Sequence, residues 1–390
     1  MIRAVAISLC AVIACAAPDV SPPTTPAQSP ADAAVPLDAA VDALVDTPLD
    51  ALSVDAPVVT ADPPAPAAEV WLKGSTHVHA RPSGDSSTPI PEVLAWYETR
   101  GYDFIVLTDH NQISELAKDA PSTAGDVAIR NPPSGLIVLA GIELTHNPSN
   151  CIPPGDKSGK CRIHVNLLGV TARTTGKLTW ANRKTSDRLK KYDAALEQQK
   201  LLGGLAQVNH PNWFWGMNGD LLAELARRGF RIVEIANSAF QKWNKGDKDH
   251  PDMDHVWDAA LKQGVTLWGV ASDDAHDYGG SKTAKYPAGG GWIVVRAARD
   301  PKAILAAIDA GRFYSSNGPV LEHAEVDGDQ LVVAVADAKR RRYQIDFIEN
   351  GVRVARVTGT RARRTVPAKG YLRAVVTGPD GTAWVQPVRR

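Results

Sequence analysis

Histidines and carboxylates recur in this sequence at spacings that suit metal coordination. They occur in six short segments: His77-Val78-His79, Thr108-Asp109-His110-Asn111, Gly141-Ile142-Glu143, the isolated His164, Asn209-His210-Pro211 and Asp274-Ala275-His276. Two histidines separated by one residue on a strand point to the same face, so one segment can supply two ligands. Imidazole and carboxylate together suit zinc, manganese or iron and require no thiolate. The residue types therefore predict a centre that binds divalent metal ions.

These segments lie in or directly after apolar runs that are typical of buried strands. The seven runs cover residues 70–75, 103–108, 136–144, 163–170, 205–209, 232–237 and 265–272. Helical patterns lie between or after them at 91–101, 182–202, 221–229, 254–263 and 301–311. This alternation predicts an α/β fold with parallel strands that are closed, or nearly closed, into a barrel. Because the carboxyl ends of such strands meet on one face, we expect the six segments to converge there.

A single histidine on an apolar strand is more often a packing residue than a ligand. Six of the ten histidines lie at expected strand ends, however, and this favours ligands over packing residues. The other four, which we expect at the surface, are His146, His250, His255 and His323. Adjacent residues on a strand face opposite ways, so Asp274 rather than Asp273 is the predicted ligand. Asp109 is expected to stabilise its turn or to orient a ligand.

The order of the six segments resembles the ordered motifs of the PHP (polymerase and histidinol phosphatase) superfamily. The similarity covers roughly residues 69–318 and is greatest to the secreted, carbaryl-hydrolase-like branch of that superfamily. The resemblance implies a distorted (β/α)7 TIM-like barrel with a centre of two or three metal ions. A small antiparallel β domain would follow at residues 319–390, where apolar and polar residues alternate between Asn-Gly and Asp-Gly turns.

The resemblance also implies which side chains share an ion. His77, His79, Glu143 and Asp274 would hold the first metal, and Glu143 would bridge to a second held by His164 and His210. A third metal would take His110, His276 and an acidic residue that the family often places in a Ser-Asp-Gly segment. This chain instead has Ser83-Gly84-Asp85-Ser86, so Asp85 is our candidate for that position.

A metal centre of this kind predicts a hydrolase. Adjacent divalent ions make a water nucleophilic near neutral pH and polarise the oxygen of the bond under attack. Our leading hypothesis is a phosphoesterase that cleaves an anionic phosphomonoester or phosphodiester with metal-bound hydroxide. Asp274 and His276 would assist proton transfer, and Arg81 would either clamp an anionic oxygen or be solvated. A carboxyl ester, amide or carbamate hydrolase is the alternative, and a non-catalytic surface protein that keeps the metal for structure is the third possibility.

Two segments beside the predicted ligands could shape a substrate pocket. Trp213 and Trp215 follow His210 closely, so they either pack internally or form a pocket wall. Residues 277–291 are rich in glycine and match no phosphate-binding or dinucleotide-binding loop, so we interpret them as a mobile rim.

The N-terminal region predicts export. Residues 1–15 have one basic residue, an apolar run too short to span a bilayer, and the tetrad Val-Ile-Ala-Cys, which resembles a bacterial lipobox. We therefore expect a lipoprotein signal peptide with Cys15 lipidated at the cell envelope, or else a secretory signal cut near Ala16 or Ala17. Residues 16–68 are rich in Ala, Pro and Asp, which predicts a disordered tether. In an exported protein Cys151 and Cys161 are expected to form a disulfide, with a zinc pair as the alternative.

The charge balance excludes some classes of protein and partner. The 390 residues are 44% hydrophobic and carry 43 Lys and Arg against 43 Asp and Glu. This composition is too polar for a protein with many membrane spans, and the zero net charge indicates no nucleic acid partner. The charge is nevertheless uneven, because residues 1–68 hold eight Asp and one Arg, whereas residues 319–390 hold 13 Lys and Arg against 8 Asp and Glu. The basic segment could contact an anionic envelope surface, although a solvated charged face is the better explanation.

Overall fold

The strands of this protein form one large mixed sheet and one small sheet. The computed structural model describes residues 68–114, 128–130, 135–174, 176–281, 283–336 and 342–390. Its strands are β1 (Val70–Val78), β2 (Phe104–Leu107), β3 (Ala128–Arg130), β4 (Ile137–His146), β5 (Ile163–Leu168), β6 (Leu205–Val208), β7 (Ile232–Asn237), β8 (Trp268–Ser272), β9 (Trp292–Ala297), β10 (Phe313–Ser316), β11 (Leu321–Asp327), β12 (Gln330–Val335), β13 (Gln344–Glu349), β14 (Val352–Thr358), β15 (Arg361–Thr365), β16 (Leu372–Gly378) and β17 (Gly381–Val388). The expected signal peptide and residues 16–67 of the expected tether lie outside the described residues.

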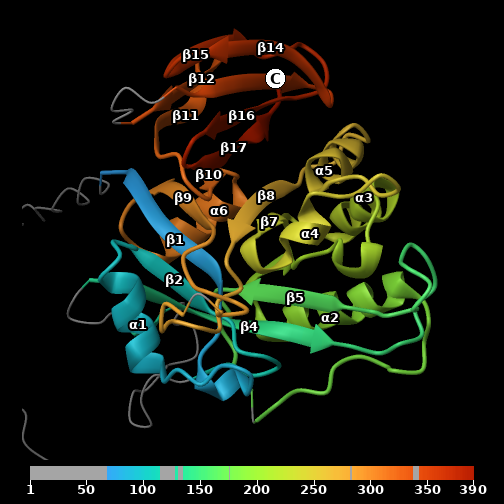
Figure 1. Ribbon diagram of the computed structural model, residues 1–390. Helices are drawn as coiled ribbons and strands as arrows, with labels where there is room; N and C mark the ends of the chain where they lie inside the picture. The colour runs from blue at the N-terminus through green and yellow to red at the C-terminus, as the bar shows by residue number, and fades with distance from the viewer. Residues whose placement is uncertain (1–67, 115–127, 131–134, 175, 282, 337–341) are drawn as a thin grey trace, which may run out of the picture. The chain divides into compact units, whose positions relative to one another are not determined.

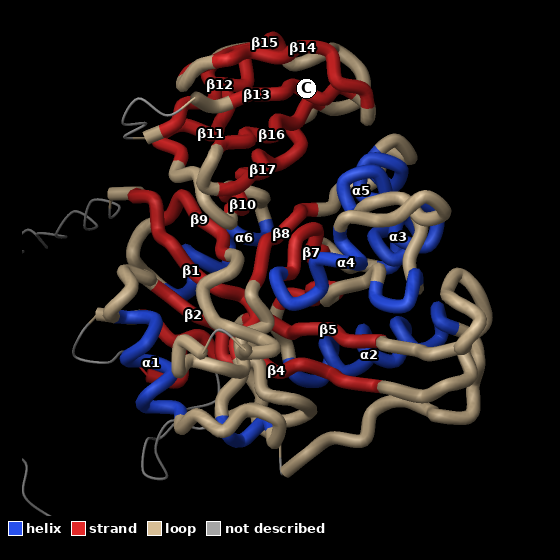
Figure 2. Tube along the Cα trace, viewed as in Figure 1, coloured by secondary structure: helices blue, strands red, loops and turns tan. Residues whose placement is uncertain are grey.

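Six α-helices occur in the described part of the chain, and they flank the large sheet (Figures 1 and 2). They are α1 (Ile90–Glu98), α2 (Arg188–Leu202), α3 (Gly219–Arg228), α4 (Gln241–Asn244), α5 (Met253–Leu261) and α6 (Pro301–Asp309). Asp187, Asn218, Asp252 and Asp300 begin α2, α3, α5 and α6 by accepting hydrogen bonds from the first-turn N–H groups. None of these helices is long and apolar enough to cross a bilayer. The predicted strand and helix segments are confirmed as elements, with their ends shifted by a few residues.

The predicted (β/α)7 barrel is wrong. The large sheet has 14 strands in the order β14-β13-β16-β17-β10-β9-β1-β2-β4-β5-β6-β7-β8, with β3 beside β4, and its two end strands do not pair with each other. Among the described strands, the parallel pairs are β1·β2, β2·β4, β6·β7 and β7·β8. The pairs β1·β9, β9·β10, β4·β5 and β5·β6 are antiparallel. The fold is therefore an open mixed sheet with helices at its faces.

The reversal at β5 has a local cause. A parallel neighbour requires a crossover connection, usually a helix, whereas an antiparallel neighbour requires only a turn. The chain between β4 and β5 contains no helix, and Cys151 and Cys161 close a loop within it with their Cα atoms 5.4 Å apart. This pair confirms the predicted disulfide. Because no helix carries the chain back across the sheet between β4 and β5, β5 runs antiparallel to β4. β5 is also antiparallel to β6, although α2 lies between these two strands.

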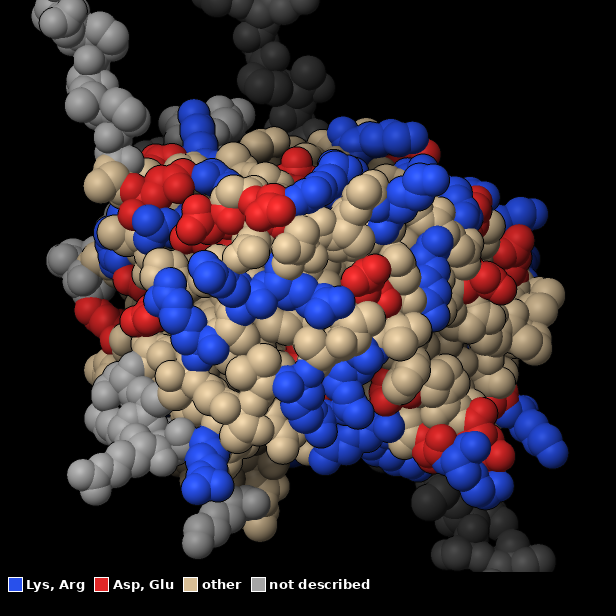
Figure 3. All heavy atoms as spheres, turned by 90° about the horizontal axis from the view of Figure 1, so that it is seen from above, with Lys and Arg blue, Asp and Glu red and all other residues tan. Residues whose placement is uncertain are grey.

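The C-terminal strands are antiparallel, as predicted, but most of them do not form a separate sheet. β17 pairs with β10, and β16, β13 and β14 then continue the large sheet outward. Only β11, β12 and β15 form the second sheet. The alternating pattern after residue 318 predicts strands but does not indicate which strand continues an existing sheet. Figure 3 looks down on these C-terminal strands, and more Lys and Arg than Asp and Glu side chains are visible on that face.

A buried ion pair joins these C-terminal strands to the helical layer. Arg373 of β16 is only 1% exposed, and its Nε and Nη2 each donate to Asp258 of α5 at 2.7 Å. The Tyr371 hydroxyl donates to the same carboxylate at 2.7 Å. Three hydrogen bonds thus compensate the cost of burying these charges.

Candidate metal centre

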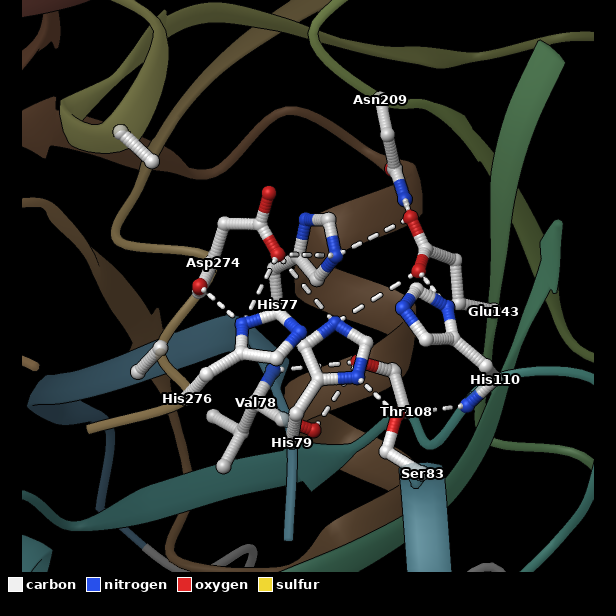
Figure 4. A network of polar contacts seen from close by, with 12 residues as sticks. His77, Val78, His79, Ser83, Thr108, His110, Glu143, Asn209, Asp274 and His276 are labelled. Atoms are coloured by element: carbon white, nitrogen blue, oxygen red, sulfur yellow. Dashed lines mark hydrogen bonds and ion pairs between the residues drawn. The ribbon is translucent and has the colours of Figure 1, made fainter. Parts of the chain in front are cut away.

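The predicted ligands converge because of the strand directions. β1, β2 and β4 are parallel neighbours, so His79, His110 and Glu143 lie at the same edge of the sheet. β5 runs the other way, and it brings His164 to that edge because this residue lies at the beginning of the strand, opposite Thr145 of β4. Figure 4 shows the side chains of His77, His79, His110, Glu143, Asp274 and His276 pointing toward one another.

The loop after β8 completes the cluster. An isolated bridge joins Val78 to Ala275, and the His79 N–H donates to the Ala275 carbonyl at 3.0 Å. This contact places Asp274 between the first two histidines, with its Oδ1 at 3.1 Å from His77 Nε2 and 3.2 Å from His79 Nε2.

Three groups of side chains could each hold a metal ion, because their ligand atoms lie within 4.8 Å of one another. The groups are His77 with His79 and Asp274, Glu143 with His164 and His210, and His79 with His110 and His276. Glu143 is fully buried and lies close to five of these histidines. Its oxygens are 3.2 Å from His77, 3.5 Å from His79, 2.5 Å from His110, 3.0 Å from His164 and 3.7 Å from His210. Glu143 is therefore at the position expected for a ligand shared between ions.

The histidine rings are oriented as ligands. His77, His79 and His276 each have one buried ring nitrogen, Nε2, with no hydrogen-bond partner among the described residues. The other nitrogen of each ring lies within hydrogen-bond distance of an oxygen. His77 Nδ1 is 2.7 Å from Glu234, His79 Nδ1 is 3.0 Å from Ser83, and His276 Nδ1 is 2.8 Å from the Asp274 carbonyl. A ring held at one nitrogen while the other faces carboxylates is the usual arrangement of a metal-binding histidine, so these residues fit divalent ions.

Asp85 lies beside the third group. Its Oδ2 is 3.0 Å from His110 Nε2 and 3.2 Å from His276 Nε2, although the side chain is 53% exposed. The shifted motif therefore brings an acid to the two histidines with which Asp85 was predicted to act.

Electrostatic interactions keep the acids ionised and two of the histidines neutral. Burial opposes ionisation of Glu143 and Asp274, but the surrounding histidines outweigh burial and lower the pKa of both carboxyls. Burial, with the neighbouring His276 and His110, lowers the pKa of His79 to about 3. Burial likewise lowers the pKa of His164 to about 4, although Glu143 opposes the shift. Despite burial, the same carboxylates raise the pKa of His77, His110 and His276 above that of a free imidazole. Ionised carboxylates and neutral imidazoles are the forms that bind metal, so these three rings would each release a proton when an ion binds.

Three residues of the site have left-handed backbone conformations that are uncommon for non-glycine residues. Their φ angles are 58° at Asn111, 26° at His210 and 50° at Asp274. Such strain persists only where neighbouring contacts hold it, and it clusters at functional sites. The His210 N–H is held by Glu234 at 2.5 Å, and the Asn111 amide exchanges hydrogen bonds with the backbone of Thr145.

Glu234 was missed by the sequence analysis. It lies on β7, is fully buried and accepts hydrogen bonds from the Ser272 hydroxyl and the Asn237 amide as well as contacting His77. The available signal was a carboxylate inside the otherwise apolar run 232–236. Asn209 was also not assigned a role, and its amide donates to Glu143 at 2.9 Å.

An open cavity of about 260 Å³ adjoins the cluster. Besides the metal-binding groups, it is lined by Thr145, Asn147, Trp213, Phe240 and Tyr286. Phe240 stacks on His210 with the ring centroids 4.3 Å apart, and the ring centroids of Tyr286 and His276 are 5.1 Å apart. Trp213 forms part of the cavity wall, whereas Trp215 is buried and stacks on His250 with the ring centroids 4.1 Å apart. Tyr286 belongs to the glycine-rich segment that was predicted to form a rim.

The remaining predicted residues lie around this site. Arg81 does not line the cavity, and its exposed guanidinium donates to the Ser87 carbonyl at 3.1 and 3.2 Å. Asp109 accepts from the Ala80 N–H and the Ser114 hydroxyl, and therefore stabilises its turn as predicted.

Asp273 accepts hydrogen bonds from Ser75, Tyr97 and the Gly289 N–H, which connects β8 to the loop before β9. His146 was predicted to lie at the surface, and this is wrong. His146 is 5% exposed and packs on Trp180, with the two ring centroids 5.5 Å apart.

No family model and no curated protein matches this chain. Its function is therefore inferred from the chemistry of the site.

Proposed function

We propose that this protein is a metal-dependent hydrolase that cleaves phosphate esters with two or three zinc, manganese or iron ions. The observation that carries the proposal is the sharing of ligands. Glu143 lies within 4 Å of five histidines, so its two carboxylate oxygens could serve neighbouring ions. His79 belongs to two of the three groups, but its single free nitrogen would hold one ion only. Adjacent divalent ions lower the pKa of a shared water and polarise the ester oxygen. The motif order that resembles the PHP superfamily supports the same chemistry.

The chain's own groups would orient the substrate and move protons. Asp274 lines the cavity, and its lowered pKa keeps it ionised at neutral pH, so its Oδ2 can accept a hydrogen bond from the attacking water and orient it. A carboxylate with a lowered pKa is a weak base, so Asp274 would pass the proton on to the leaving group rather than retain it. His276 lies beside it, with Nε2 3.2 Å from Asp85, and would hold the third ion together with that acid. Trp213, Phe240 and Tyr286 would exclude water from one side of the bound ester.

A second candidate is hydrolysis of a neutral carboxyl ester or carbamate at the same centre. This candidate is favoured by the cavity wall, because the described residues that line it include three aromatic rings and no Lys or Arg. Such a wall suits an apolar substituent better than a second anionic group. Phosphoester cleavage remains the leading proposal, because bound divalent ions would themselves supply positive charge for a phosphoryl group.

The experiment is a parallel assay of metal-replete protein on the p-nitrophenyl esters of phosphate, bis-phosphate, acetate and an N-methylcarbamate. We expect turnover of a phosphoester that is lost in His77→Ala. His255→Ala is the matched control, because His255 is 75% exposed on α5 and should leave turnover unchanged. Bound metal with turnover of only the acetate or carbamate would establish the second candidate. Bound metal without any turnover would refute a hydrolase and favour a binding protein.

We further propose that the protein acts after export, because a disulfide between Cys151 and Cys161 suits an oxidising compartment. Fractionation of the producing cells tests this proposal. Recovery of the mature chain in the cytoplasm with both thiols reduced would refute it.

A further inference from the structure

A groove of about 820 Å³ lies at the opposite end of the strands from the metal centre. Trp71 at the start of β1 and Trp268 at the start of β8 line it, together with Val326 of β11 and Val388 of β17. His77 follows Trp71 by six positions along β1, and at about 3.3 Å per residue the two lie roughly 20 Å apart. The groove is therefore separate from the metal centre and does not depend on the proposed hydrolase function.

One cation in this groove lacks a polar partner. Arg296 of β9 is half-buried and lies directly opposite Trp71 in the antiparallel register, with its guanidinium 5.6 Å from the indole centroid. Within the part of the chain that the structure describes, this guanidinium makes no hydrogen bond or ion pair. A half-buried guanidinium that has only an aromatic partner keeps five N–H donors available to a ligand.

The other arginine side chains of the groove are already engaged. Arg312 pairs with Glu69 at 2.5 Å, and Arg389 donates to the backbone carbonyls of Leu261 and Val265 at 2.9 and 3.1 Å. Glu325 is a half-exposed carboxylate that lies 3.8 Å from His323 on its own strand and forms an ion pair with it only when that histidine is protonated. Among the described residues of the groove, Arg296 is therefore the arginine whose N–H donors have neither a carboxylate nor a carbonyl acceptor.

We propose that this groove binds a small amphipathic carboxylate, such as a medium-chain alkyl acid. The planar guanidinium of Arg296 would hold the carboxylate through two parallel hydrogen bonds, which is the geometry that arginine provides best. The alkyl chain would lie along Trp268, Val326 and Val388 and remove apolar surface from water. A single available cation suits a monoanion, and the apolar walls distinguish such a ligand from an inorganic ion.

The experiment is calorimetric titration of the full, metal-replete protein with octanoate, 1-octanol and octylammonium. We expect octanoate to bind at least about tenfold more tightly than either of the others, because a hydrogen bond to a charged group is worth that much or more. Across butyrate, hexanoate and octanoate, affinity should rise about fourfold for each added CH2 group. Equal binding of octanol, no dependence on chain length, or no octanoate binding would each overturn the proposal.

Three variants locate the ligand. Arg296→Gln should lower octanoate affinity to the octanol level while it leaves the thermal unfolding temperature unchanged. Arg361→Gln is the matched control, because this arginine is 62% exposed on β15 and should leave octanoate binding as it is. Glu143→Gln perturbs the metal centre and should also leave octanoate binding intact. Loss of octanoate binding in Glu143→Gln, or its retention in Arg296→Gln, would show that the carboxylate binds elsewhere and overturn the proposal.

Discussion

Glu234→Gln should weaken metal binding although Glu234 is not itself one of the predicted ligands. Glu234 Oε1 lies 2.7 Å from His77 Nδ1 and 2.6 Å from the Ser272 hydroxyl, and Oε2 accepts from the His210 N–H at 2.5 Å and the Asn237 amide at 2.9 Å. All of these neighbours can donate, and a carboxylate can accept from all of them at once. Glutamine is nearly the same size but replaces one oxygen with an NH2 group, which is a donor.

Either orientation of that amide carries a cost. If the NH2 group replaces Oε2, it faces the N–H donors of His210 and Asn237, and unsatisfied buried donors cost about 1–3 kcal/mol each. If it replaces Oε1, it donates to His77 Nδ1 and shifts the ring proton to Nε2, the nitrogen that must face the metal. Changes to groups that orient metal-binding histidines typically reduce affinity 10–100-fold, which corresponds to about 1.4–2.8 kcal/mol. We expect a loss of that size.

The assay is a competition titration with a chromogenic chelator, performed with zinc and with manganese. Circular dichroism of the metal-free variant establishes that it is folded before the titration. Glu197→Gln is the matched control, because Glu197 is 65% exposed on α2 and, within the described ranges, forms an ion pair with Lys200 alone. A folded Glu234→Gln protein that binds metal within about twofold of the wild-type affinity would refute the assigned role.

Three further predictions concern the third ion, acid stability and the C-terminal strands. Asp85→Ala should reduce the number of ions bound per chain without unfolding the protein, because Asp85 is half exposed and the ion pairs that it forms with described residues are with His110 and His276 of the third group. Plasma emission analysis that showed an unchanged number of ions per chain would contradict this. In the metal-free protein, the pKa values of His79 and His164 are about 3 and about 4, against 6.5 in the unfolded chain. The unfolded state therefore takes up protons that the folded state does not as the pH falls from 6.5 to 4. These two groups should lower the free energy of unfolding by at most about 1.4 kcal/mol per pH unit each, and a flat series of urea titrations would refute this. Asp258→Asn should lower the free energy of unfolding by about 3 kcal/mol, because it leaves the buried Arg373 without its bidentate partner. If urea titrations showed a decrease in the free energy of unfolding below about 1 kcal/mol, the importance of that ion pair would be refuted.

Most of the ligand groups are recognisable in the sequence because their signals are local. The pair His77 and His79 is recognisable from its spacing alone, and Glu143, His164 and Asp274 each stand out within or beside an apolar run. Glu234 carried the same kind of signal, but a single carboxylate in a strand does not show which ring it would contact. Its partner His77 is 157 residues away in the chain, and the pairing of the intervening strands brings them together.

The topology was the part that local patterns predicted wrongly. Periodicity distinguishes a strand from a helix, but it does not specify the direction in which the strand pairs. The run 163–170 looks like any other buried strand, and only its pairing with Glu143 and Gly141 shows that β5 runs backward. The same limit applies at the C-terminus, where the alternation correctly predicts strands but leaves open that β17 joins β10.

By itself, the sequence determined which residues are buried strands, which side chains can bind metal, and that Cys151 could pair with Cys161. The tertiary structure decided where those side chains meet. His164 reaches the centre from the beginning of its strand, Asp85 reaches His110 across 25 residues, and Arg296 is left facing Trp71 in a groove. The physical reason is that side-chain chemistry and periodicity are local properties, whereas strand direction and long-range contacts depend on how the whole sheet assembles.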